Sequence, residues 1–324
     1  ADDEIDLHAR VGRSGVRGRR DELVFDRQHD RGGLECAGGA DGREVSLSTG
    51  RGCADALRGE GFEVTEIDAG RDLAARLAEL RPDVCFNALH GRWGEDGAVQ
   101  GMLDWLDIPY THSGVAASAL AMDKTRTKVI YRDAGLPIAE SVIVSREAAQ
   151  AGHALPTPHV IKPNDEGSSV GIYIVEAGAN LPPALPDTMP AEVMVEAYVA
   201  GRELTCTVLG REAMDVTEIV TGGWYDFDAK YVEGGSRHVI PADIPDDVTG
   251  LCRDYALRAH DALGCRSLSR TDYRWDAGGA GLVLLETNTQ PGMTPTSLTP
   301  EQAAHRGITF GRLCATLVED AWRG

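Results

Sequence analysis

The stretch from Leu282 to Leu298 reads L-V-L-L-E-T-N-T-Q-P-G-M-T-P-T-S-L. Its first four residues are apolar, which predicts a buried strand. Glu286 and Asn288 follow at the end of that strand, and residues two apart on a strand point to the same face. A carboxylate and an amide oxygen are hard ligands of the kind that Mg²⁺ selects when it also holds phosphate oxygens. We therefore expect a magnesium site where this strand ends.

The same spacing occurs upstream in S-L-S-R-T-D-Y-R, where Arg270 and Asp272 lie two residues apart. Between the two stretches, D-A-G-G-A-G predicts a hairpin turn, so the two strands should be neighbours. After the second strand, Pro291 and Gly292 predict a turn that leaves backbone N–H groups available. A lone E-x-N is more often an ordinary solvated strand end. The combination of R-x-D, E-x-N and P-G-M-T is what predicts a functional site.

Composition limits the classes of function. The 324 residues suggest two or three lobes, and 42% hydrophobic content is ordinary for a globular protein. No apolar run reaches the roughly 18 residues of a membrane span, and no signal-peptide pattern opens the chain, so we expect a cytoplasmic protein without membrane contact. A net charge of −19 argues against nucleic acid as a partner. The seven cysteines are scattered without C-x-x-C, which indicates neither a zinc site nor a disulfide framework.

Residues 1–37 have a composition unlike the rest of the chain. Seven arginines lie between Arg10 and Arg31, among Gly, Asp and His, with little hydrophobic periodicity. This composition predicts an irregular extension. A basic tail that binds polyanions is a weaker alternative, and both a natural extension and a wrong-frame start remain open.

From Gly38 onward, helix and strand patterns alternate. A glycine turn leads into a helix that reaches about Arg58, F-E-V-T-E-I alternates as a strand, a second helix follows, and residues 82–90 read as a buried strand. Such alternation predicts a parallel sheet with helical crossovers. Ligands of these sheets lie beyond the carboxyl ends of the strands, which places the loop from His90 to Gly97 at the site.

In the middle of the chain, the pattern first predicts one helix that is closed by Gly135. It then predicts a hairpin over residues 159–175, which read H-V-I-K-P-N-D-E-G-S-S-V-G-I-Y-I-V. Lys162 ends the first strand of this hairpin, and the glycine-serine tip can form a flap over phosphates. An ordinary hairpin turn is the alternative. Farther on, a strand, a hinge and another strand carry Glu196 and Glu203, and a final helix begins at about Gly311.

Seven motifs together resemble a known family: R-E-V-S-L, H-G-x-x-G-E-D-G, A-M-D-K, K-P-x-x-E-G-S-S-V-G, Y-D-x-x-A-K-Y, R-x-D and E-x-N-T-x-P-G-M-T. From about Gly38 to its C-terminus, the chain resembles the D-alanine–D-alanine ligases of the ATP-grasp superfamily. The resemblance implies an α/β (α+β) ATP-grasp fold with an N-terminal Rossmann-like parallel-sheet domain. The expected division is an irregular extension (1–37), an N-terminal substrate domain (38–113), a central ATP-grasp subdomain (114–197) and a C-terminal subdomain with the metal and catalytic residues (198–324).

The resemblance also implies a reaction. ATP phosphorylates the carboxylate of one D-alanine, and the amine of a second D-alanine attacks the acyl phosphate, giving D-alanyl-D-alanine for peptidoglycan precursors. Two Mg²⁺ ions, with Mn²⁺ as a substitute, and a homodimer belong to this expectation. Two alternatives stay open: a ligase of another amino or hydroxy acid, and an ATP-binding relative with impaired catalysis.

By the family's pattern, each part of the reaction has its own residues. The metal ligands are Asp272, Glu286 and Asn288; ATP is bound by Lys124, Lys162, Glu196, Ala197, Val199, Glu203 and Lys230; the catalytic residues are Arg270, Gly292, Ser168 and Tyr231; and the amino-acid substrates are bound by His90, Ser297, Leu298 and Asp41.

Two features of the chain depart from the family's pattern. The glutamate that takes the ammonium of the first D-alanine directly precedes R-E-V-S in the family, and here that position is Gly42. Asp41, one residue earlier, is the candidate substitute. The apolar first strand of the family is replaced by R-G-G-L-E-C-A, so we expect the parallel sheet to lack its first strand. These two departures motivate the alternative of impaired catalysis.

Overall fold

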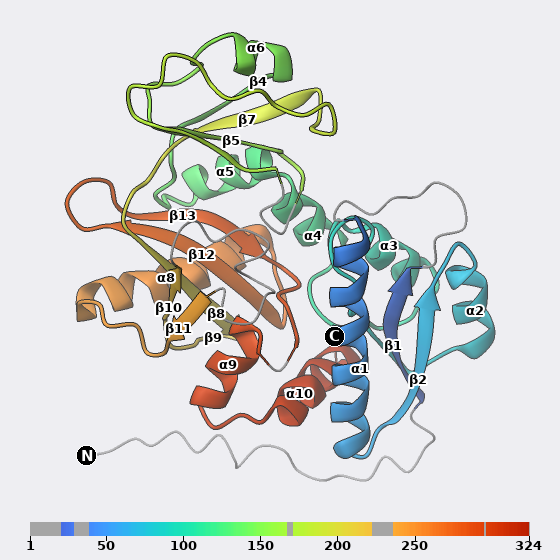
Figure 1. The fold of residues 1–324 in the computed structure, drawn as a ribbon. Helices are drawn as coiled ribbons and strands as arrows, with labels where there is room; N and C mark the ends of the chain where they lie inside the picture. The colour runs from blue at the N-terminus through green and yellow to red at the C-terminus, as the bar shows by residue number, and fades with distance from the viewer. Residues whose placement is uncertain (1–20, 29–38, 167–170, 222–235, 295, 324) are drawn as a thin grey trace, which may run out of the picture.

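The computed structural model describes residues 21–28, 39–166, 171–221, 236–294 and 296–323, and for residues 21–28, 39–45 and Leu47 it describes the backbone alone. Ser168, Lys230, Tyr231 and the tip of the expected flap lie outside the described residues, as does the side chain of Asp41. The described chain forms one parallel and two antiparallel sheets with helices packed on them (Figure 1). This mixed architecture agrees with the α/β (α+β) class expected from the sequence.

The N-terminal sheet is parallel, as the alternation predicted. It has the order β2-β1-β3, with β1 (Asp21–Gln28), β2 (Glu63–Ala69) and β3 (Val84–Phe86). The expectation of a missing first strand is therefore wrong, because β1 lies at the centre and pairs with both neighbours. The expectation that residues 1–37 are irregular is also wrong for residues 21–28, because these form β1. The segment D-E-L-V-F holds a short apolar run that the surrounding arginines obscured.

Helix α1 (Gly39–Gly59) stands against this sheet, and α2 (Leu73–Leu80) and α3 (Ala98–Trp105) also belong to this part of the chain (Figure 1). The predicted glycine turn is part of α1, which already begins at Gly39. Cys53 and Leu57 are fully buried in a core with residues of α10 (Phe310–Arg323), so the first described helix packs against the last. Burying a leucine side chain contributes about 2 kcal/mol.

The middle of the chain forms a four-stranded antiparallel sheet. Its order is β4-β7-β5-β6, with β4 (Ser141–Ser145), β5 (His159–Lys162), β6 (Tyr173–Val175) and β7 (Glu192–Ala197), and α6 (Arg146–Ala151) packs on it. The antiparallel pairing of β5 with β6 confirms the predicted hairpin.

The single helix expected before this sheet is two helices, α4 (Val115–Met122) and α5 (Lys124–Asp133). Asp123 between them has extended backbone angles, and its Oδ1 accepts a hydrogen bond from the backbone N–H of Arg126 at 3.1 Å. An aspartate in this position caps the start of a helix, which explains the break.

The C-terminal sheet is the largest. It has the order β11-β10-β8-β12-β13, with β9 paired to β8, and is made of β8 (Arg202–Leu209), β9 (Glu212–Ala213), β10 (Thr217–Thr221), β11 (Ser236–Val239), β12 (Leu268–Asp276) and β13 (Gly281–Asn288). Helix α8 (Asp246–Leu263) buries Cys252, Ala256 and Ala259 in the core beside this sheet. The short helix α9 (Leu298–His305) was not predicted.

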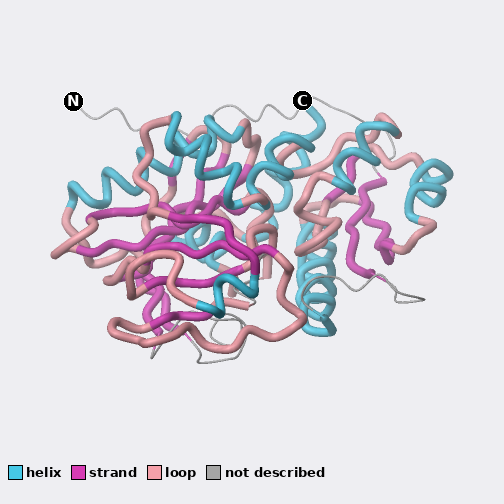
Figure 2. The backbone as a smooth tube through the Cα atoms, turned by 90° about the horizontal axis from the view of Figure 1, so that it is seen from above, coloured by secondary structure: helices cyan, strands magenta, loops and turns pink. Residues whose placement is uncertain are grey.

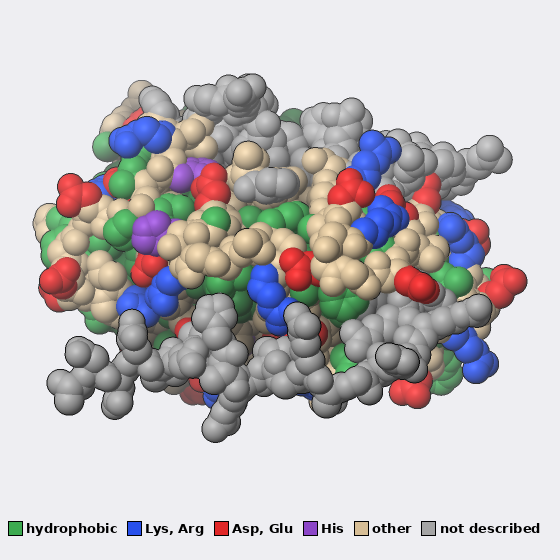
Figure 3. Space-filling view, turned by 90° about the horizontal axis from the view of Figure 1, so that it is seen from below, with side chains coloured by type: hydrophobic (Ala, Val, Ile, Leu, Met, Phe, Trp, Pro, Cys, Tyr) green, Lys and Arg blue, Asp and Glu red, His purple; other side chains and the backbone are tan. Residues whose placement is uncertain are grey.

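Figure 2 shows the parallel sheet at one end of the molecule, with α1 between it and the two antiparallel sheets. The face in Figure 3 carries Lys and Arg side chains interspersed with Asp and Glu, without a continuous basic area among the described residues. Within the described ranges, no helix is long and apolar enough to cross a membrane.

Candidate active site

The two strands that carry the predicted metal ligands pair side by side, as the sequence indicated. Asp272 on β12 lies opposite Glu286 on β13, and Arg270 lies opposite Asn288. Because alternate residues share a face, all four side chains project to one side of the sheet. Arg270 donates through Nε and Nη2 to the two carboxylate oxygens of Asp272, at 2.8 Å each, and Asn288 Nδ2 donates to Asp272 Oδ2 at 2.9 Å.

Asp272 has a further partner that sequence reasoning missed. Thr205 on β8 donates its hydroxyl to Asp272 Oδ1 at 2.6 Å. On the other face of the strands, Thr271 and Thr287 lie 2.9 Å apart, and Tyr131 donates to Thr287 at 2.5 Å. The carboxylate is therefore fixed from three sides on a strand pair whose far face is a buried, hydrogen-bonded layer.

A second charged cluster surrounds Glu196 on β7. The Glu196 carboxylate is 3% exposed, with Oε1 at 2.5 Å from Lys128 Nζ and Oε2 at 2.5 Å from Lys162 Nζ. Burial raises the pKa of Glu196, but the two ammonium groups outweigh burial and hold it below its usual value. Lys128 was missed in the sequence, although it lies four residues after Lys124 on one helix face. Burial lowers the pKa of Lys128 despite the neighbouring carboxylate.

Lys124 links this cluster to the predicted metal ligands. Its Nζ donates to the backbone oxygen of Glu166 at 2.5 Å and lies 3.9 Å from Glu286 Oε2. Burial lowers the pKa of Lys124, and the attraction of Glu286 offsets only part of that effect. A narrow cavity of about 30 Å³ is lined by Lys124, Glu286, Asn288, Glu166 and Glu95. The structure thus brings the loop after β3 to the same crevice as the metal-ligand strands.

His90 lies on that loop and is held by two hydroxyl groups and one carboxylate. Its Nδ1 is 3.0 Å from Glu95 Oε1, its Nε2 is 3.1 Å from Thr49 Oγ1, and its backbone N–H donates to Ser46 Oγ at 3.2 Å. Ser46 and Thr49 belong to α1, so the R-E-V-S-L-S-T segment meets the loop where the sequence placed the site.

The backbone of α1 also places the two unusual positions near its start. A residue of an α-helix shares its face with those about four and seven positions later. Gly42 therefore lies on the face of Ser46 and Thr49, which contact His90. Asp41 is rotated by about 100° from Gly42, toward the face of the exposed Ser48.

The turn after β13 brings Gly292 and Ser297 together. A Cβ added at Gly292 would lie 3.0 Å from Ser297 Oγ, so only a glycine leaves that hydroxyl unobstructed. Ser297 Oγ also accepts from the backbone N–H of Thr294 at 3.1 Å and lies 2.7 Å from the Thr294 hydroxyl. The side chain of Leu298 is buried against Ile219, so only its backbone is placed to meet a ligand.

Glu203 is held apart from the lysine cluster. Arg274 Nη1 lies 3.4 Å from Glu203 Oε2, and Arg274 Nε donates to the backbone oxygen of Val199 at 3.2 Å. Ala197 uses its N–H within the sheet, where it donates to the backbone oxygen of Glu140 at 2.9 Å.

A parallel N-terminal sheet followed by two antiparallel sheets, with lysines on one and paired acidic strand ends on the other, defines an ATP-grasp ligase. Family models agree with this class: one described as D-ala D-ala ligase C-terminus matches residues 130–319, and one described as D-ala D-ala ligase N-terminus matches residues 72–113. The chain belongs to the D-alanine–D-alanine ligase family.

Individual relatives span most of the chain. A protein of Ruegeria sp. named D-alanine–D-alanine ligase is 68% identical over 281 residues, which cover 86% of this chain and 92% of the relative. A protein of Cereibacter sphaeroides with the same name is 66% identical, and the match covers the same fractions of the two chains. Among solved structures, D-alanine–D-alanine ligase from Bacillus anthracis is 25% identical with a TM-score of 0.72, covering 94% of this chain and 97% of that one. VanG D-Ala:D-Ser ligase from Enterococcus faecalis shares the fold, with a TM-score of 0.74 at 24% identity. That match covers 94% of this chain and 100% of the other.

Proposed function

We propose that the protein ligates two D-alanine molecules to D-alanyl-D-alanine with consumption of ATP, as a step in peptidoglycan precursor synthesis. The observation that carries this proposal is the facing pair of strand ends, Arg270 and Asp272 opposite Asn288 and Glu286, beside the ammonium group of Lys124. Relatives named for this ligase, up to 68% identical, support the choice of substrate.

The proposed reaction has two steps. A carboxylate oxygen of the first D-alanine attacks the γ-phosphorus of ATP, ADP leaves, and an acyl phosphate forms. The amine of the second D-alanine then attacks the acyl carbon, phosphate leaves, and the amine loses a proton. Phosphoryl transfer depends chiefly on positioning and on neutralisation of charge. A site with several fixed cations suits that demand.

On the ATP side, Lys124 and Lys162 would neutralise the phosphates. Lys128 acts through its ion pair: it shares the Glu196 carboxylate with Lys162 and so fixes the position of that ammonium group. Glu203, with the backbone of Ala197 and Val199, forms the proposed adenosine side. Ser168, Lys230 and Tyr231 lie outside the described residues, and we assign them to the closing flap and loop from the family's pattern alone.

The donor set at the strand ends fits Mg²⁺. No group of three or more His, Cys, Asp and Glu side chains surrounds one point among the described residues, but two carboxylates and one amide are what a magnesium site uses when phosphates and water fill the remaining positions. We therefore propose that Asp272, Glu286 and Asn288 hold two Mg²⁺, for which Mn²⁺ can substitute. When bound there, the metal would supply positive charge that neutralises the phosphate oxygens.

On the amino-acid side, Arg270 and the N–H of Gly292 would stabilise the oxyanion of the tetrahedral intermediate. Ser297, beside Gly292, would bind the carboxylate of the second D-alanine, with the backbone of Leu298 next to it. His90 would lie beside the first D-alanine. Asp41 remains the proposed substitute for the glutamate that Gly42 replaces.

The proposal also covers the domain organisation, the oligomeric state and the location of the protein in the cell. We propose that segments 38–113, 114–197 and 198–324 act as three lobes and that two copies form a homodimer, which sedimentation velocity would test. A cytoplasmic location is consistent with the cysteines of the described chain, all of which are free thiols.

The comparisons offer no support for a different acid substrate or for impaired catalysis.

The test is ADP release measured with and without D-alanine, with detection of the dipeptide by mass. We expect D-alanine-dependent ADP release with one dipeptide formed for each ADP. Mixtures that offer D-serine or D-lactate as the second substrate should still give D-alanyl-D-alanine as the main product. ATP binding without dipeptide would contradict the proposal and would leave an ATP-grasp protein without ligase turnover.

A further inference from the structure

Helix α9 begins directly after Ser297, the residue that the proposed function assigns to the carboxylate of the second D-alanine. Ser297 is the capping residue, and Leu298 is the first residue of the helix. The helix lies against the C-terminal sheet beside β8 (Figure 1). The position of Ser297 in the site therefore depends on how α9 is attached to this sheet.

The C-terminal sheet has a gap in its hydrogen-bond ladder where α9 meets it. On one side of β8, pairing with β10 extends from Glu203 to Thr205, and pairing with β9 begins at Val208. Thr207 lies between the two paired segments, and its backbone oxygen accepts a hydrogen bond from the N–H of Met214 at 2.8 Å. The buried N–H of Thr207 needs a partner as well, because an unpaired backbone N–H in the interior is unfavourable.

One side chain of α9, that of Gln302, occupies the gap. Its Oε1 accepts a hydrogen bond from the backbone N–H of Thr207 at 2.8 Å, and its Nε2 donates to the backbone oxygen of Thr205 at 3.3 Å. Nε2 also donates to the hydroxyl of Thr217 on β10 at 2.9 Å. The carboxamide thus binds an N–H and a C=O of β8 as one residue of a neighbouring strand would.

This contact is fully buried, and a second residue of α9 takes part in it. Gln302, Thr299, Thr205 and Thr207 are all 0% exposed. The Thr299 hydroxyl lies 3.0 Å from the Thr207 hydroxyl. Thr299 and Gln302 are three residues apart, so they share the face of α9 that meets β8. Because a buried polar group that loses its partner is costly, these hydrogen bonds fix the helix at one position on the strand.

The same contact reaches the proposed metal ligands. Thr205, whose backbone oxygen is bound by Gln302, donates its hydroxyl to Asp272 Oδ1 at 2.6 Å. Ser297 at the start of α9 and Asp272 on β12 are therefore both positioned relative to the same residue of β8. A reaction between groups that are held on separate elements depends on their relative placement, and a shift of about 1 Å can lower its rate about 100-fold.

We propose that Gln302 and Thr299 are positioning residues for the second substrate. By fixing α9 on β8, they hold Ser297 where the amine of the second D-alanine reaches the acyl phosphate. Both side chains are fully buried, so they act through Ser297 and not on a substrate. This inference rests on the proposed ligase function.

The test compares two nucleophiles that compete for the same acyl phosphate. D-alanine gives the dipeptide. Hydroxylamine attacks the acyl carbon through its nitrogen, loses a proton and displaces phosphate, which gives D-alanine hydroxamate. Hydroxylamine has no carboxylate, so it does not need Ser297. The ratio of hydroxamate to dipeptide, measured by mass at fixed concentrations of ATP, Mg²⁺, D-alanine and hydroxylamine, does not depend on how much of the enzyme is folded.

The variants separate positioning from a general loss of stability. Gln302→Met keeps the length of the side chain without its hydrogen bonds and should raise the ratio about tenfold. Thr299→Val should raise it about threefold, whereas Thr299→Ser, which keeps the hydroxyl, should retain the wild-type ratio. The matched control is Gln150→Met on α6, where Gln150 accepts from the backbone N–H of Leu185 at 3.0 Å, and it should leave the ratio unchanged.

Two results would overturn this inference alone. If hydroxamate and dipeptide fall together in Gln302→Met and in Thr299→Val, so that the ratio stays at the wild-type value, both residues serve only the stability of the fold. An equal rise of the ratio in Gln150→Met would show that it does not report on α9. Should Gln302→Met fail to fold, the pair Thr299→Val and Thr299→Ser decides. A wild type that forms neither product would instead contradict the ligase function, and this inference with it.

Discussion

The two walls of the candidate active site differ in how they hold charge. The first wall, made by α5, β7, β12 and β13, is called the charged wall here. Its acidic and basic groups are already paired: Glu196 with two lysines, and Asp272 with Arg270. On the wall made by α1 and the loop after β3, His90 is held by hydroxyls and by one carboxylate, Glu95. The first wall suits the proposed nucleotide, which carries most of the charge, because fixed charges need no reorganisation during reaction.

The largest effect should follow from breaking the buried cluster on the charged wall. Glu196→Gln removes the counter-charge of two buried lysines and should lower the free energy of unfolding by about 3–5 kcal/mol, measured by urea denaturation. The matched control is Glu192→Gln, the same change four residues earlier on β7 at an exposed position. If both variants lose the same stability, the cluster does not stabilise this wall.

The next effect concerns activity. Asp272→Asn removes one charge from the proposed metal site and leaves Arg270 without its carboxylate partner, so kcat for ADP release should fall by about 100- to 1000-fold. Asp276→Asn is the control on the same strand, since Asp276 instead accepts from the backbone N–H of Gly278 and Ala280 in the turn. A kcat for Asp272→Asn within about twofold of the wild type would remove Asp272 from the proposed mechanism.

A third prediction concerns His112, a buried histidine in the segment after β3, and tests its protonation through pH. Burial, with the charges of His90 and Arg266, lowers the pKa of His112 to about 3. The unfolded chain binds a proton near pH 6.5, so between pH 6.5 and 3 the unfolded state holds more protons than the folded state. The free energy of unfolding should therefore fall as pH falls through this window, by up to about 1.4 kcal/mol per pH unit from this residue.

The measurement is urea denaturation at several pH values between 4 and 7. His112→Gln should flatten the pH dependence, whereas His153→Gln, at an exposed histidine, should leave it unchanged. An unchanged slope in His112→Gln would mean that His112 is not held neutral in the folded protein.

The smallest effect should come from adding a carboxylate to α1, on the wall that holds His90. Gly42→Glu places a carboxylate on the helix face of Ser46 and Thr49, and should lower the KM for the first D-alanine about tenfold. Ser48→Glu adds the same charge to an exposed position of the same helix and is the control. Equal KM values in the two variants would show that the face of α1 does not matter, and Asp41→Asn would then become the informative substitution.

The sequence predicted the charged wall better than the wall made by α1 and the loop after β3. The pairing of β12 with β13 follows from local patterns, two apolar strands joined by a short turn, and their two-residue spacing fixes which side chains share a face. Lys128 was missed because its partner Glu196 is distant in sequence, although the four-residue helical spacing from Lys124 was a usable signal.

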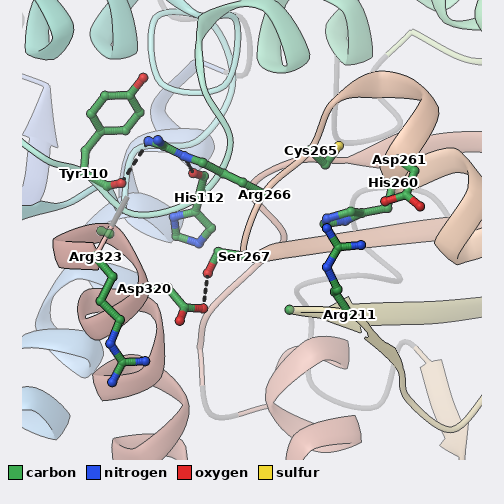
Figure 4. Close-up of a pocket in the computed structure, with 12 residues that line it drawn as sticks. Tyr110, His112, Arg211, His260, Asp261, Cys265, Arg266, Ser267, Asp320 and Arg323 are labelled. Carbon is green, nitrogen blue, oxygen red and sulfur yellow. Dashed lines mark hydrogen bonds between the residues drawn. The ribbon is translucent and has the colours of Figure 1, made fainter.

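The errors lay where structure depends on distant partners. β1 is recognisable as a strand only through its pairing with β2 and β3, because its own short apolar run is surrounded by arginines. A cavity of about 730 Å³ that is lined by Tyr110, Arg211, Arg266 and Arg323 (Figure 4) was not predictable, because these residues come from four separate segments. None of these segments carries a pattern that indicates a shared wall.

The packing of α1 on α10 has a consequence for how the protein is made. Leu57 and Cys53 are buried in a cluster that also contains Leu313 and Leu317, which lie more than 250 residues later in the chain. A ribosome therefore releases the N-terminal sheet with part of its apolar surface still exposed, and that surface stays exposed until α10 has been synthesised. Such long-range contacts slow folding and extend the period of vulnerability to aggregation. We expect nascent chains that stop before residue 310 to depend on chaperones through their N-terminal part, at the opposite end of the sequence from the missing helix.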